Sequence, residues 1–266
     1  MSAPTVAYIY YLLRFTEYAA CIAMIVFGIL VVINKEKQTK ILGISFIISG
    51  VSSLLGSAFT TVRRFVGVAV FTRMSYFSAV ISMLTSAAVM FCICWYIHKT
   101  YGKKYIYIPV FAIMAVNRIA TFIVNICLNK AMKGGISGLW MSLVSQVNGF
   151  VSGTAVAVVI FIPFYLNRNK EKIIPHTWIF RIVMYVHSTI VTLLTIYSYV
   201  LMLRVIKKPG KLPSGLSIIN NSGNVSDSVM LLQIFGALIE LAFPVYVFIR
   251  LKRANAGAAA QQTDKS

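Results

Sequence analysis

Acidic side chains are scarce in this chain of 266 residues, which has six Asp and Glu against 25 Lys and Arg and a formal net charge of +19. Charged residues of both signs make up 12% of the sequence, about half of the ~25% that is usual for a soluble domain. In a soluble protein such a basic excess would suggest binding to nucleic acid. Here most Lys and Arg lie in short loops between apolar runs, so we expect contacts with a lipid bilayer and no nucleic-acid partner.

Cysteine and histidine are also rare, with four and three residues respectively. The sequence has no CxxC, HxxxH or HExxH spacing, and Cys92 and Cys94 are too close together for the usual zinc pair. It also has no GxSxG elbow and no Gly-rich phosphate loop. Glu17 and Glu240 are the only carboxylates within apolar runs. An intramembrane hydrolase with paired catalytic carboxylates would therefore need both of them in one site. We therefore expect no enzyme activity, no metal or cofactor, and four free cysteines buried in apolar surroundings.

Long apolar runs dominate what remains, since hydrophobic residues make up 59% of the chain and its mean hydropathy is +0.82. Seven runs reach the ~20 residues with which a helix crosses a bilayer. They cover residues 8–34, 41–61, 75–97, 105–128, 142–166, 177–203 and 229–250. The sequence thus predicts an all-α membrane protein, a seven-transmembrane-helix bundle over residues 1–253 with a short disordered cytoplasmic tail over 254–266.

The positive charges of the loops predict that the N-terminus lies outside and the C-terminus inside. Thirteen Lys and Arg fall on the predicted inner side, against nine on the other. The longest loop, 204–228, holds two N-x-S sequons at Asn220 and Asn224. Glycosylation at these sites would place that loop outside, which agrees with the charge bias.

Ionisable side chains inside the spans are the strongest leads to function, because each costs about 2.5–3.5 kcal/mol at mid-helix. Four such ionisable residues and two uncharged polar residues in the spans are the candidate ligand-binding residues. They are Glu17, Arg118, His187, Glu240, Asn148 and Gln233. The functional interpretation is that these residues line a cavity open to the outside and bind a ligand there. The alternative is that they pair with one another, as Arg14 and Glu17 can do at their i,i+3 spacing.

Small residues on the second and third spans predict close helix packing and hydrogen bonds between helices. Ser52 and Gly56 belong to this group on the second span, and Thr85 belongs to it on the third. Pro244, four residues after Glu240, predicts a kink in the seventh span.

The seven spans, the outside N-terminus, the short loops and the basic segment Arg250-Leu251-Lys252-Arg253 after the last span resemble a G-protein-coupled receptor. The resemblance is one of topology over the whole chain, and the familiar motifs of rhodopsin-like receptors are missing. It implies an effector such as a G protein at the cytoplasmic side. We therefore predict a multi-pass receptor of the plasma membrane that senses a small extracellular ligand and signals through its cytoplasmic loops.

Two other functions stay open at this point. A transporter or channel would use Glu17, Arg118, His187 and Glu240 as an ionisable path, although the chain shows no convincing inverted repeat. A non-signalling membrane organiser would only pack helices and lipids, and it would tolerate substitution of every polar residue that does not affect folding.

Overall fold

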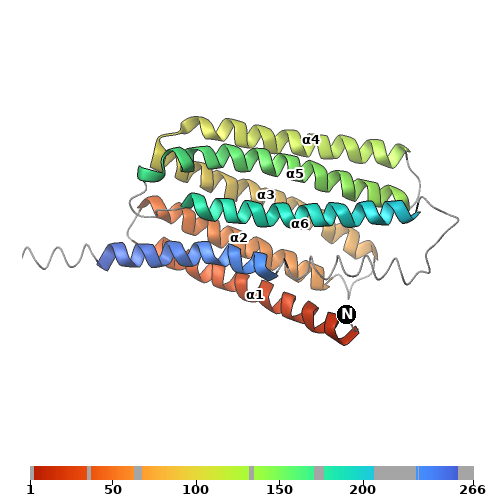
Figure 1. Cartoon of the computed structure of the whole chain (residues 1–266), viewed down its shortest axis with the longest axis horizontal. Helices are drawn as coiled ribbons and strands as arrows, with labels where there is room; N and C mark the ends of the chain where they lie inside the picture. The colour runs from red at the N-terminus through yellow and green to blue at the C-terminus, as the bar shows by residue number, and fades with distance from the viewer. Residues whose placement is uncertain are drawn as a thin grey trace, which may run out of the picture. The chain divides into compact units, whose positions relative to one another are not determined.

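Long α-helices form the chain in the computed structural model, which describes residues 3–34, 37–62, 68–131, 135–170, 177–206, 232 and 234–256. These ranges contain no strand (Figure 1). Short 3-10 turns, Lys104–Ile106 and Arg168–Lys170, follow the third and fifth helices. The labelled helices are α1 Ala3–Ile33, α2 Lys37–Val62, α3 Val68–Tyr101, α4 Tyr107–Ala131, α5 Gly135–Leu166 and α6 Thr177–Ile206. We call the last helix, Ile234–Ala256, the C-terminal helix.

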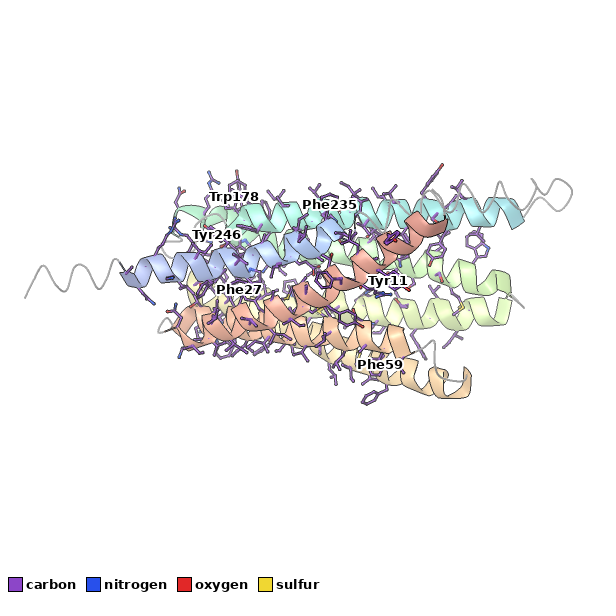
Figure 2. All side chains as sticks on the ribbon, turned by 90° about the horizontal axis from the view of Figure 1, so that it is seen from below. Tyr11, Phe27, Phe59, Trp178, Phe235 and Tyr246 are labelled. Atoms are coloured by element: carbon purple, nitrogen blue, oxygen red, sulfur yellow. The ribbon has the colours of Figure 1, made fainter. Side chains whose placement is uncertain are left out.

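Seven of these helices are long and apolar enough to cross a membrane, which confirms the predicted seven-helix membrane fold. Their apolar segments are Tyr11–Ile33, Thr39–Phe59, Phe77–Tyr101, Lys104–Val124, Trp140–Leu166, Thr177–Leu201 and Ile234–Ala256. The C-terminal helix continues three residues into the predicted tail. Many large apolar side chains lie on the outside of the helices, such as Phe235, labelled in Figure 2, which is 60% exposed. Such surfaces suit a lipid bilayer as solvent.

Two helix ends are fixed by local hydrogen bonds. Gly102 adopts a positive φ of 69° after α3, and its N–H donates to the carbonyl of His98 at 2.8 Å. This is the left-handed stop that glycine adopts without steric cost. At the end of α5, the Asn167 side chain donates to the carbonyl of Pro163 at 2.8 Å. The carbonyl of Pro163 also accepts from the backbone N–H of Asn167 at 3.2 Å, so both groups of Asn167 bond to the last turn of the helix.

The chain divides into two compact units, each built from separate segments of sequence. Unit 1 comprises Met1–Leu13, Ile108–Val159 and Ile182–Gly236, and unit 2 comprises Arg14–Tyr107, Ile160–Arg181 and Ala237–Ser266. Most of the fully buried apolar side chains belong to unit 2, among them Leu42, Ile97, Phe164 and Val247.

Glycines hold α1 and α2 of unit 2 in close contact. A Cβ atom at Gly43 would lie 2.7 Å from the carbonyl oxygen of Gly28, and one at Gly50 would lie 2.9 Å from that of Cys21. These distances leave no room for a side chain, so the two backbones touch directly. On its other side α2 meets α3, where the hydroxyls of Ser52 and Thr85 share a hydrogen bond of 2.8 Å. This bond confirms the predicted link between small polar residues of these two helices.

Aromatic rings fill the part of unit 2 around the C-terminal helix. Phe243 meets Phe46 edge to face with ring centroids 5.5 Å apart, and it lies 5.4 Å from Phe180. Phe180 also lies 4.9 Å from Tyr246, which Figure 2 labels on the C-terminal helix. Tilted and edge-to-face pairs at these separations are the favoured arrangements of aromatic rings. The C-terminal helix is therefore fixed to α2 and α6 through Phe243.

Candidate functional site

Glu17 on α1 forms an ion pair with Arg14 one turn earlier. Nη1 of Arg14 donates to Oε2 of Glu17 at 2.8 Å, and both side chains are about a quarter exposed, at 24% and 26%. Helical spacing alone explains this contact, since residues i and i+3 lie on one face. The pairing that the sequence left as an alternative for Glu17 is therefore present in the structure.

Glu240 on the C-terminal helix has an unusual environment. It precedes the buried Phe243, Pro244 and Val247 by three, four and seven residues, so it shares their face of the helix. The side chain of Glu240 is nevertheless exposed. A carboxylate is therefore exposed on a helix face that is buried from Phe243 onward.

The structure brings Glu17 and Glu240 to the same part of unit 2. Both carboxylates belong to this unit and lie within electrostatic range of the buried thiol of Cys21. We call Arg14, Glu17, Cys21 and Glu240 the acidic recess.

Asn148 contributes to a polar contact within unit 1. Its Nδ2 group lies 2.6 Å from Oδ1 of Asn117 and 2.8 Å from Oγ1 of Thr121, which links α5 to α4. A cavity of about 10 Å³ adjoins this contact, which is room for about one water molecule. Its lining comprises Thr121, Val124, Val144, Ser145 and Asn148. Asn148 is thus a helix-packing residue next to a cavity too small for an organic ligand.

Arg118 and His187 also belong to unit 1 but have different surroundings. Arg118 is exposed on α4, although its neighbour Asn117 makes the contact to α5. Nε2 of His187 on α6 lies 2.7 Å from the carbonyl oxygen of Leu232. A Cβ atom at Gly236 would lie 2.5 Å from Cε1 of His187, so the glycine makes room for the ring. The imidazole therefore joins α6 to the beginning of the last span.

Three predicted sites lie outside the described residues or have no described side chain: Gln233, Asn220 and Asn224. The cysteine prediction is confirmed for Cys21, Cys92 and Cys94, which are free and buried. It is wrong for Cys127, which is free but exposed, on a part of α4 where apolar side chains such as Ile126 are also exposed. Within the described ranges, no three His, Cys, Asp or Glu lie close enough together to hold a metal ion.

Arg181 at the start of α6 is a residue whose environment the sequence did not reveal. Its position near the end of a span favours a side chain that reaches out to water. Instead, its guanidinium lies between two rings, 5.7 Å from the centre of Phe164 and 5.6 Å from that of Phe243. The rings belong to α5 and to the C-terminal helix, so no local sequence pattern pairs them with Arg181. Tyr185, four residues after Arg181 on α6, donates its hydroxyl to Thr154 at 3.1 Å.

The fold and its apolar helices define the class of protein, a multi-pass α-helical membrane protein. No family model, curated protein or solved structure matches the chain.

Proposed function

We propose that this protein is a membrane receptor in which a small ligand enters the acidic recess from outside and contacts Glu240. The observation that carries the proposal is the exposure of Glu240 on a helix face that is buried from Phe243 onward. A charged group in a span is costly, and proteins retain such groups mainly for binding or transport. The exposed carboxylate of Glu240, in the same unit as the Arg14–Glu17 pair, is therefore the best supported contact for a ligand.

The packing next to Glu240 provides a means of signalling. Phe243 lies one turn further along the helix and contacts Phe46, Phe180 and Arg181. A ligand that moves Glu240 would also shift Phe243 against these neighbours on α2 and α6. A ligand changes the population of two packings when it binds one of them more tightly. A cytoplasmic effector such as a G protein would recognise the repacked conformation. This mechanism suits a receptor better than a channel or transporter.

A panel of small molecules tests the proposal on cells that express the surface-tagged chain, with cyclic AMP and calcium as readouts. For any molecule that evokes a response, we expect Glu240→Gln to lower its potency about tenfold or more, the effect of losing one charged hydrogen bond. Leu238→Ala is the matched control, because Leu238 lies two residues away on another, exposed face of the helix.

The same cells separate the receptor from the alternatives. Arg118→Ala is measured alongside, since Arg118 stays a predicted ligand residue. Unchanged potency of both Glu240→Gln and Arg118→Ala at normal surface levels would contradict the proposed site. Whole-cell currents or uptake of a radiolabelled ligand, without any second-messenger response, would identify a channel or transporter instead.

A further inference from the structure

Three buried polar atoms in unit 2 have no hydrogen-bond partner within the described residues. They are the hydroxyl of Thr100 and the Nε atoms of Arg181 and Arg250. Buried donors are almost always satisfied in native proteins, so each such group needs an explanation. Two of the three atoms belong to guanidinium groups, whose N–H donors match the oxygens of a carboxylate or phosphate.

The three groups lie near helix ends that are on the same side of the membrane. Thr100 is one residue before the end of α3, Arg181 is the fifth residue of α6, and Arg250 is six residues before the end of the C-terminal helix. Because consecutive spans cross the membrane in alternate directions, these three ends emerge on one side. All three residues belong to unit 2.

No described carboxylate lies at this end of the helices. Glu240 is ten residues before Arg250 on the C-terminal helix, which is about 15 Å. Glu17 is sixteen residues before Ile33, the end of α1 on this side, which is about 24 Å. Among the described residues Arg181 has aromatic faces as neighbours, and neither Arg181 nor Arg250 forms an ion pair. A buried guanidinium nitrogen without an acceptor is unfavourable, so an anion that reaches these Nε atoms would stabilise this end.

The ends of α3 and α5 on the same side have the features of a membrane–water interface. Lys99 lies over the ring of Trp95 at 5.5 Å, and Arg168 lies over that of Tyr165 at 4.5 Å. Trp95 is 40% exposed and Tyr165 is 42% exposed. Tryptophan and tyrosine favour the headgroup level of a bilayer, and basic residues near that level attract anionic lipids.

We propose that Arg181 and Arg250 form a site for the phosphate of an anionic phospholipid headgroup. The guanidinium groups would donate to the phosphate oxygens in the charge-assisted geometry that arginine provides. The exposed Lys252 and Arg253 add positive charge beside the site. A lipid is the favoured source of the phosphate because the site lies at headgroup level, next to the leaflet that surrounds the chain.

Thermal unfolding of the purified full chain in detergent tests this proposal. Short-chain phosphatidylinositol bisphosphate, phosphatidylserine, phosphatidylcholine and inorganic phosphate are titrated separately, and the shift in midpoint gives an apparent affinity for each. We expect saturable stabilisation by the two anionic lipids and little by phosphatidylcholine or inorganic phosphate. Arg250→Gln should weaken the binding of anionic lipid about tenfold. Arg253→Gln removes the same charge from an exposed position three residues away and should weaken it less than about threefold.

Equal effects of the two substitutions would overturn the proposal, because they would show that only diffuse charge attracts the lipid. If phosphatidylcholine or inorganic phosphate stabilised the chain as much as the anionic lipids do, the bound phosphate would not come specifically from an anionic lipid headgroup, and the proposal would be overturned. If Arg250→Gln does not fold, Arg250→Lys keeps the charge without the guanidinium donors and replaces it in the comparison. Wild-type affinity of that lysine variant would also contradict the site.

Discussion

At the scale of single residues, charge inside the membrane is tolerated through specific neighbours. Arg14 and Glu17 neutralise each other on one helix face, whereas Arg181 lies between two aromatic rings. The first arrangement could be predicted from sequence because its two residues are three positions apart. The second could not, because Phe164 and Phe243 lie 17 residues before and 62 residues after Arg181 in the chain. Only the fold brings them together.

The Arg14–Glu17 pair is expected to stabilise α1 measurably. Glu17→Gln should lower the free energy of unfolding by about 1 kcal/mol, because both side chains are partly exposed and solvent screens the charge. Unfolding of the purified chain in detergent measures this for Glu17→Gln, Arg14→Gln and the double variant. The double variant should be less destabilised than the sum of the two single variants, since each single change leaves one charge without its ion-pair partner. Strictly additive losses would show that the pair contributes nothing.

At the scale of helices, small residues decide how closely two spans approach. The sequence predicts close packing through the Ser and Gly residues of the second span, and the Ser52–Thr85 bond confirms one such contact. Sequence alone does not show which glycine is essential. Gly56 has open space where a Cβ would stand, whereas Gly43 and Gly50 touch the backbone of α1. Spacing identifies a face of a helix, but the partner that covers that face depends on the whole fold.

Gly43→Ala and Gly56→Ala form a matched pair that tests this contact. A methyl group at Gly43 would collide with the backbone of Gly28 at 2.7 Å, so α1 and α2 must separate. We expect a loss of about 1–3 kcal/mol in unfolding free energy for Gly43→Ala. Gly56→Ala should be neutral or stabilising by up to about 1 kcal/mol, because alanine favours a helix over glycine. Equal stability of the two variants would contradict the close contact of α1 and α2.

At the scale of the whole molecule, hydrophobic length alone was sufficient to predict seven spans. Each predicted span overlaps an apolar helix of the structure, and the largest difference is at the last, predicted at 229–250 and found at Ile234–Ala256. The C-terminal ends differ because Lys252 and Arg253 interrupt the apolar run while the helix continues through them, and residues 229–231 and 233 lie outside the described part of the chain. The candidate site was harder to predict. Glu17 and Glu240 share the acidic recess, whereas Asn148, Arg118 and His187 lie in unit 1 with separate contacts.

The orientation of the chain stays a prediction, and the receptor proposal depends on it, because the acidic recess must open outside the cell. The most direct measurement is therefore topology in intact cells. Epitope tags at the two ends are probed before and after permeabilisation, and glycosidase shifts are compared for wild type, Asn220→Gln and Asn224→Gln. We predict an N-terminal tag that is accessible on intact cells, a C-terminal tag that needs permeabilisation, and a glycosidase shift that the Asn substitutions reduce. A C-terminal tag accessible on intact cells would reverse the topology, place the acidic recess on the cytoplasmic side, and contradict a receptor for an extracellular ligand.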